Sequence, residues 1–239
     1  MRFSRVLLKL SGEALMGEGG EQYGHARLTA LAQAIAQVAQ EGVQIGVVVG
    51  AGNIFRARSA KLEGLGRVTA DHVGMLATVM NAAVLRDYLR AEGAMARIFT
   101  PREVVPLTWA FSREAVKPLL HAGQVVLFGG GTGNPFFTTD TAAALRAAEI
   151  GADVLLKGTQ VDGVYDQDPR RHPDARRFDR LTYDEVLTRR LGIMDLTAIS
   201  LCAEQGLPIV VFDIADPRNL LRVLSGELQG TWIAKEQAP

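Results

Sequence analysis

Six short apolar runs, separated by longer segments rich in alanine and leucine, constrain the fold of this chain more than any other feature. Each run is apolar at nearly every position, as expected of strands that are buried on both faces. A run that alternated with polar residues would instead indicate a strand with one solvated face. We therefore predict strands at residues 6–10, 45–49, 96–100, 125–128, 154–157 and 209–212.

The segments between these runs carry helical patterns. We predict helices at residues 27–41, 70–92, 141–150 and 183–191, the last after a capping box formed by Thr182 and Glu185. Strands that alternate with helices indicate an α/β fold, here an open, mainly parallel, twisted β-sheet between two helical layers. We expect a single domain, 1–239, with two functional halves at 1–122 and 123–239.

The charge balance and the cysteine content exclude several classes of protein. Lys plus Arg and Asp plus Glu both number 26, so no global field attracts nucleic acid or a membrane surface. No apolar run is long enough to span a bilayer, and no basic start precedes a hydrophobic region. The single cysteine, Cys202, excludes an intramolecular disulfide and is expected to be a buried thiol. We expect a soluble, cytoplasmic protein.

The sequence GGGTGNPFFTTD at 129–140 is the most informative signal of a site, and it follows the predicted strand 125–128. Glycines between a buried strand and a helix N-terminus expose unpaired backbone N–H groups, which suit an anion such as a phosphate. The phenylalanines and threonines add an aromatic wall and hydroxyls for a ring that carries carbonyls. This segment predicts a site for a nucleotide or a small phosphate ester.

Other predicted strands also end in residues suited to phosphate binding. Ligands of open parallel sheets gather at the carboxyl ends of the strands. These ends carry Lys9, Ser11 and Gly12, then GAGN at 50–53 with Arg56, and later Lys157, Gly158 and Thr159. Phosphoryl transfer needs positioning and charge neutralisation more than covalent help. An isolated lysine at a strand end is usually solvated, but Lys9 lies in an apolar strand beside a Ser-Gly turn, which favours a role in this chemistry.

Several familiar kinds of site are absent from the sequence. It contains no GxxxxGK[ST] phosphate loop, and no GxGxxG fingerprint follows the first strand. The histidines lack the spacing of metal ligands, and no Ser/His/Asp arrangement is recognisable. Asp71 and Asp140 each lie near a predicted helix start, where capping or a favourable helix dipole would explain them equally well.

The motifs together resemble one family over nearly the whole chain. KLSGEAL at 9–15, VVVGAGNIFR at 47–56, DHVGMLATVMN at 71–81, GTGNPFFTTD at 131–140, VDGVYDQDP at 161–169 and MDLTA at 194–198 are similar to the bacterial uridylate (UMP) kinases of the amino acid kinase superfamily. The resemblance implies an amino acid kinase-like three-layer sandwich and the reaction ATP + UMP → ADP + UDP in pyrimidine nucleotide biosynthesis. It places the UMP and phosphate side in residues 1–122 and the ATP side in 123–239.

The resemblance also implies roles for individual residues. The catalytic residues would be Lys9, Arg56 and Asp140, with Asp140 orienting the lysine. The ATP site would comprise Lys9, Leu10, Ser11, Gly12, Gly52, Arg56, Thr159, Tyr165 and Asp168. The UMP site would comprise Ala51, Asp71, Thr132, Gly133, Asn134, Pro135, Phe136, Phe137, Thr138 and Thr139. No metal ligands are assigned, because the phosphates of ATP can supply most ligands of Mg²⁺.

Further expectations come from the family alone. The resemblance implies Mg²⁺ with ATP, activation by GTP, inhibition by UTP and assembly as a homohexamer. The segment 17–24 resembles the segment that is linked to GTP activation in the family. The chain departs from the usual Gly-Gly-Gly-Asn at 50–53, where Ala51 must keep a negative φ or shift the turn.

Three other functions remain open from the sequence. A sister kinase acting on carbamate, acetylglutamate, glutamate or aspartate would leave the PFFTT segment and Asp71 unexplained. A nucleotide-binding protein without turnover would not need Lys9, Arg56, Asp140 and Asp168 together. A secondary role in nucleic-acid regulation gains no support from the balanced charge.

Overall fold

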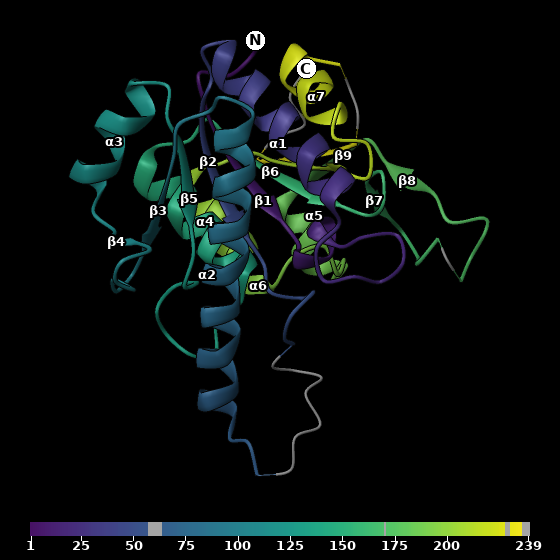
Figure 1. Cartoon of the computed structure of the whole chain (residues 1–239). Coiled ribbons are helices and arrows are strands. Elements are labelled where there is room, and N and C mark those ends of the chain that lie inside the picture. Colours follow the sequence, from purple (N-terminus) through teal and green to yellow (C-terminus); the bar gives the residue numbers. More distant parts are fainter. Residues whose placement is uncertain (57–63, 170, 228–229, 236–239) are drawn as a thin grey trace.

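The computed structural model describes residues 1–56, 64–169, 171–227 and 230–235. Within these ranges a nine-stranded sheet has the strand order β4-β3-β5-β2-β1-β6-β10-β11-β9. In that order the strands are Trp109–Ala110, Ala96–Thr100, Val125–Phe128, Gln44–Val49, Arg5–Leu10, Val154–Thr159, Ile209–Asp213, Thr231–Ala234 and Arg180–Thr182. Every pairing in this sheet is parallel except β10 with β11. A small antiparallel pair, β7 (Val164–Tyr165) and β8 (Arg177–Phe178), projects to one side (Figure 1).

Helices cover both faces of the sheet. They are α1 (His25–Gln40), α2 (Arg67–Ala91), α3 (Arg113–His121), α4 (Thr139–Ile150), α5 (Tyr183–Thr188), α6 (Leu196–Gln205) and α7 (Asn219–Ser225), with a short 3₁₀ helix at Gly12–Leu15. Alternate residues of the strands pack to opposite sides, so that Leu8 joins the core under α1, α2 and α7, while Leu7 joins the core under α3, α4, α5 and α6. The prediction of a mainly parallel sheet between two helical layers is confirmed.

All six predicted strands form, but several helix boundaries differ. α2 begins at Arg67, three residues earlier than predicted, and α5 ends at Thr188, before the predicted end at residue 191. The chain turns there, with Arg190 at a φ of 50°. Helices α3 and α7 and strand β11 were not predicted, because short elements carry too few residues for a clear period. The sequence suggests that residues 235–239 are frayed, and 236–239 of this segment lie outside the described residues.

Helix α2 corrects one expectation about membranes. By length and composition it is apolar enough to cross a bilayer, with a mean hydropathy of 1.3 over an 18-residue window, so the statement that no apolar run is long enough was wrong. About 44% of that window is buried, and α2 contacts α1 and strands β2, β3 and β5 as the core helix of a soluble protein does. Its first turns extend beyond the sheet (Figure 1), where Val68 and Leu76 are exposed.

Candidate active site

Two lysines and one aspartate form the charged centre of the site. Strand β1 is central in the sheet, and its register with β6 places Lys9 directly beside Lys157. Neighbouring strands lie about 4.8 Å apart, so two ammonium groups on the same face require an anion between them. Asp140, the second residue of α4, supplies it: its Oδ1 lies 2.8 Å from Lys9 Nζ, and its Oδ2 lies 2.8 Å from Lys157 Nζ.

The electrostatics of this trio follow from its burial. Burial alone would raise the pKa of the Asp140 carboxyl, but the ammonium groups of Lys9 and Lys157 outweigh it and hold that pKa below its ordinary value. Burial lowers the pKa of Lys157, against the opposing attraction of Asp140. Lys157 also donates to the carbonyl of Ile193. The trio carries a net positive charge, which suits a site for an anion.

The backbone turns that follow β1 and β2 approach each other closely beside Lys9. A Cβ atom on Gly12 would lie 2.4 Å from Asn53 Oδ1 and 2.5 Å from the Gly52 nitrogen, so only glycine fits there. Ser11 Oγ is buried and has no hydrogen-bond partner among the described residues. Ala51 lacks a positive φ, as predicted, so the turn accepts alanine without a left-handed residue.

These turns line a cavity of about 490 Å³ together with the first turns of α2 and the segment after β5. Eleven of the residues predicted from the sequence contribute to it: Lys9, Ser11, Gly12, Ala51, Gly52, Arg56, Asp71, Thr132, Phe137, Thr138 and Thr139. Arg56 is half exposed at its edge, where it pairs with Glu13 and donates from Nε to the Gly52 carbonyl at 3.2 Å. The cavity thus combines cations, glycine turns and an aromatic side chain.

Asp71 is held in this cavity by two partners. Arg67 Nε donates to both carboxylate oxygens at 3.0 and 2.9 Å, and the Phe136 N–H donates to Oδ2 at 2.7 Å. Phe136 takes a φ of 74°, which is rare outside glycine and here directs its N–H at Asp71. Because α2 begins at Arg67, Asp71 lies one turn inside the helix, and the capping explanation for this residue was wrong.

Helix α4 is capped by Thr138 and not by Asp140. The Thr138 hydroxyl accepts from the backbone nitrogens of Asp140 and Thr141 at 3.0 and 3.3 Å. That hydroxyl donates in turn to Asp195, which also accepts from Thr141 Oγ1 at 2.9 Å and caps α6 through the Ala198 nitrogen. Asp195 therefore ties the N-termini of α4 and α6 together and fixes the first turn that carries Asp140.

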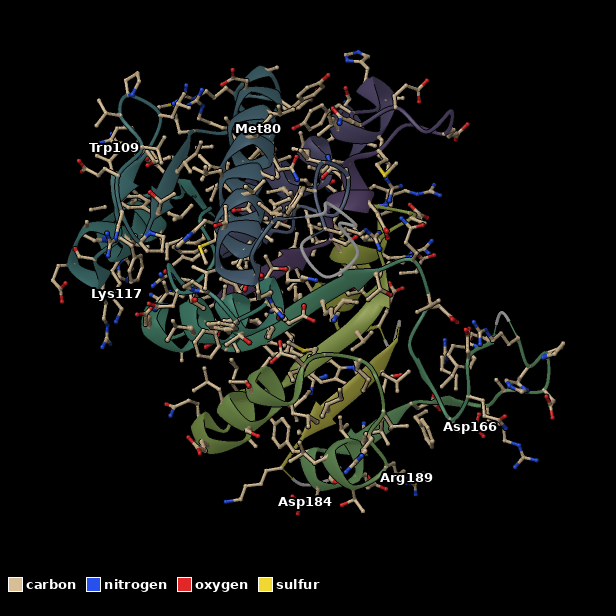
Figure 2. The ribbon with its side chains drawn as sticks, turned by 90° about the horizontal axis from the view of Figure 1, so that it is seen from below. Met80, Trp109, Lys117, Asp166, Asp184 and Arg189 are labelled. Atoms are coloured by element: carbon tan, nitrogen blue, oxygen red, sulfur yellow. The ribbon has the colours of Figure 1, made fainter. Side chains whose placement is uncertain are left out.

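A second cavity, of about 550 Å³, lies beyond the carboxyl end of β6 and contains the remaining predicted ATP residues, Thr159, Tyr165 and Asp168. Asp166 and Arg189, which also line it, are labelled in Figure 2. The Tyr165 hydroxyl donates to Asp162 Oδ1 at 2.7 Å, and Arg177 Nη1 pairs with Asp162 Oδ2 at 2.8 Å. The predicted nucleotide residues are therefore divided between two cavities, one beyond the carboxyl ends of β1, β2 and β5 and the other beyond that of β6.

Six predicted site residues do not line either cavity: Leu10, Gly133, Asn134, Pro135, Phe136 and Asp140. Leu10 is completely buried in the core, so that only its backbone faces the turns. Phe136 and Asp140 do not line the cavities, but Phe136 contacts Asp71 and Asp140 contacts Lys9, and both of these partners do.

Arg67 and Asp195 were not predicted as site residues, and Lys157 was named only among the strand-end residues suited to phosphate binding, without a role. The signal for Lys157 was its place at a strand end like that of Lys9, but the pairing of β1 with β6 was needed to join them.

The fold and the site define a family. The chain belongs to the amino acid kinase family, whose model matches residues 4–213. It is similar to a uridylate kinase from Legionella pneumophila (strain Lens), with 52% identity over 231 residues that cover 97% of this chain and 94% of that protein. The solved UMP kinase from Bacillus anthracis superposes with a TM-score of 0.95 at 34% identity, covering 99% of this chain and 98% of that one. The solved UMP kinase from Ureaplasma parvum superposes with a TM-score of 0.92 at 33% identity, covering 98% of this chain and 100% of that one.

Proposed function

We propose that this protein is a UMP kinase that transfers the γ-phosphoryl group of ATP to UMP, giving UDP and ADP. The observation that carries the proposal is the ion-paired trio of Lys9, Asp140 and Lys157 beside the cavity formed by the glycine turns. The similarity of the chain to uridylate kinases over nearly its whole length supports the same function.

In this proposal some residues neutralise charge during the transfer, and others position the reacting groups. Two anionic substrates repel each other as they meet, and Lys9 and Arg56 offset that repulsion. Asp140 keeps Lys9 directed at the phosphoryl group without itself touching it. A phosphate acceptor is already ionised near neutral pH, so no residue is required as a general base. The net positive trio stabilises the charge that spreads over the equatorial oxygens in the transition state.

The UMP site occupies the first cavity in this proposal. Asp71 accepts hydrogen bonds from ribose hydroxyls, while Phe137, Thr132, Thr138 and Thr139 surround the uracil and the α-phosphate. Gly133, Asn134, Pro135 and Phe136 complete the segment, and Ala51 faces the phosphate through its backbone. A carbamate or amino acid substrate has neither base nor ribose, which disfavours the sister kinases.

The ATP site begins at Lys9, Leu10, Ser11 and Gly12, where the Ser11 hydroxyl, which has no hydrogen-bond partner in the described part of the chain, would donate to a phosphate oxygen. Thr159, Tyr165 and Asp168 flank the adenosine in the second cavity. Both sites in this proposal draw on the two halves of one domain, residues 1–122 and 123–239. Lys9 to Gly12 serve ATP together with Thr159, and Ala51 serves UMP together with Thr132 to Thr139.

Mg²⁺ accompanies ATP in this proposal. Among the described residues no group of three or more His, Cys, Asp or Glu side chains is arranged to hold a metal ion. Such a site fits a cation that is bound mainly by phosphate oxygens and water, as Mg²⁺ often is. When bound, Mg²⁺ neutralises charge on the phosphates of ATP.

The regulation and assembly of the protein follow the family in this proposal. GTP activates and UTP inhibits a cytoplasmic homohexamer that acts in pyrimidine biosynthesis, without membrane or nucleic-acid partners. The exposed apolar side chains of Val73, Leu76 and Met80 on α2 suit an interface between subunits. Met80 is labelled in Figure 2.

The test is nucleoside diphosphate formation from Mg-ATP with UMP, CMP, dUMP, acetylglutamate and carbamate, each with and without GTP. Formation of UDP that exceeds that of every other phosphorylated acceptor by orders of magnitude supports the proposal. Phosphorylation of acetylglutamate or carbamate instead would identify a sister kinase. Tight UMP binding with no UDP would identify a binding protein without turnover.

A further inference from the structure

Asn81, in the middle of α2, is a buried polar residue that the proposed reaction does not use. Asn81 is completely inaccessible to solvent, although most of the buried residues of α2 are apolar, such as Ala82 and Leu85. A buried amide is costly unless its hydrogen bonds are made. Its position between the turn 50–53 and the loop 17–24 indicates its role.

Every hydrogen-bonding position of the Asn81 amide is occupied. Nδ2 donates to the Gly50 carbonyl and to Asn53 Oδ1, each at 2.7 Å. Oδ1 accepts from Asn53 Nδ2 at 3.1 Å and from the Tyr23 hydroxyl at 2.9 Å. An asparagine side chain offers two donors and two acceptor lone pairs, so this network is complete and rigid.

The network joins the turn after β2 to the loop 17–24. Asn53 Nδ2 also donates to the carbonyl of Gln22 at 2.9 Å, so that loop is attached through both Gln22 and Tyr23. Asn53 Oδ1 is the atom that leaves no room for a Cβ on Gly12. Asn81 and Asn53 therefore set the spacing between the turns on which the two phosphates would meet.

We propose that Asn81 is a positioning residue for phosphoryl transfer, and that Tyr23 couples the conformation of the loop 17–24 to the turn 50–53. The inference rests on the proposed kinase function, because the turn includes Ala51 and Gly52 of the two nucleotide sites. A displacement of about 1 Å between reacting groups can reduce the rate about 100-fold. A loop that moves Tyr23 can therefore change the turnover without touching either substrate.

The experiment compares three variants with the wild-type enzyme under saturating UMP and Mg-ATP. Asn81→Asp keeps the shape of the side chain but turns both donors into an acceptor that repels the Gly50 carbonyl and Asn53 Oδ1. We expect kcat to fall about 100-fold, with both KM values nearly unchanged. Tyr23→Phe removes one hydrogen bond, and we expect kcat to fall about fivefold.

Tyr88→Phe is the matched control for Tyr23→Phe. Tyr88 lies on α2 and, like Tyr23, forms one hydrogen bond, between its hydroxyl and His25 Nδ1 at 3.0 Å, but its partner His25 is the first residue of α1 and not part of the Asn81 network. We expect similar small changes in Tm for the two tyrosine variants and an unchanged kcat for Tyr88→Phe alone. In the double variant Asn81→Asp/Tyr23→Phe, the second change should have little additional effect on kcat, because the turn 50–53, through which Tyr23 would act, is already displaced by the repulsion from Gly50 and Asn53.

The possible results separate this inference from the function on which it rests. A wild-type protein that forms no UDP overturns the kinase proposal and the inference with it. A wild-type protein that forms UDP while Tyr23→Phe and Tyr88→Phe have equal kcat overturns the inference alone and makes the network purely structural. Should Asn81→Asp not fold, the two tyrosine variants still decide between these outcomes.

Discussion

The ammonium group of Lys9 lies 2.8 Å from the carboxylate of Asp140, although one residue ends the central strand and the other begins a helix on the face of the sheet. Both side chains are nearly buried, at 10% and 15% exposure. A charge pair of this kind is strongly coupled, because little water screens it. The pair directs the lysine at the cavity between the glycine turns, and several predictions depend on it.

Lys9→Met should abolish most of the turnover and leave substrate binding largely intact. A positioned charge that acts on the transition state is worth about 10²–10³ in kcat. The KM for UMP should change little, because Lys9 faces the transferred phosphoryl group, and not UMP, in the proposed function. Steady-state kinetics with both substrates measure the two effects. A variant with near-normal kcat would contradict the role given to Lys9.

Lys157→Met tests whether the second lysine contributes charge or only holds Asp140. Lys157 contacts Asp140 and the Ile193 carbonyl, so its loss leaves Asp140 paired with Lys9 alone. If Lys157 contributes charge to the site, kcat should fall nearly as far as in Lys9→Met, about 10²-fold. A purely supporting role predicts a lower Tm with kcat within a few-fold of wild type. Thermal unfolding and kinetics on the same preparation separate the two results.

Asp140→Asn should destabilise the protein by about 3 kcal/mol at neutral pH, since it leaves two buried ammonium groups without their anion. The pKa of Asp140 lies below its ordinary value of 3.8 in the folded protein. Its stabilising contribution is therefore complete above pH 3.8 and is lost as the pH falls through the lower folded value. Urea unfolding of both proteins from pH 7 downward should show the difference constant at first and shrinking only in strong acid. The exposed Asp174→Asn serves as a control, with no comparable loss expected.

Asp71→Asn should impair UMP binding more than ATP binding. A hydrogen bond to a charged group contributes about 1.5–3 kcal/mol, which corresponds to a rise in KM for UMP of about 10–100-fold. The preference for UMP over dUMP should shrink as well, because the ribose hydroxyls lose a charged acceptor. Kinetics with the two acceptors provide the measurement. Equal losses with both acceptors would mean that Asp71 only maintains the fold through Arg67 and Phe136.

Cys202 should be inert in the native protein. It is completely buried on α6, and burial, with Asp140 and Asp195 adding to it, raises the pKa of its thiol to about 12. The thiolate that reacts with electrophiles is therefore scarce at pH 8. A chromogenic disulfide reagent should label no thiol in the native protein and one per chain in denaturant, since the chain contains a single cysteine. Rapid stoichiometric labelling of the native protein would contradict this burial.

Local patterns in the sequence were sufficient for the class of fold and for many of the residues of the site. Buried parallel strands form continuous apolar runs. All six strands could therefore be predicted without knowing which strands pair with each other in the sheet. Glycines and a lysine at strand ends indicated phosphate chemistry, because carboxyl ends of parallel strands meet at one edge of a sheet. Family motifs then identified the kinase, and eleven of their residues line one cavity.

The tertiary structure alone decided which charges meet and which loops are joined. Lys157 became a partner of Lys9 only through the register of β1 with β6, and Asp140 reached both lysines because Thr138 and Asp195 fix the start of α4. In the sequence, Asn81 is one polar residue among others in a helix, and only the structure gives its four hydrogen bonds. The physical reason is the same in each case: propensity and periodicity act over a few neighbouring residues, whereas ion pairs and buried hydrogen bonds depend on distances between segments that only the folded chain brings together.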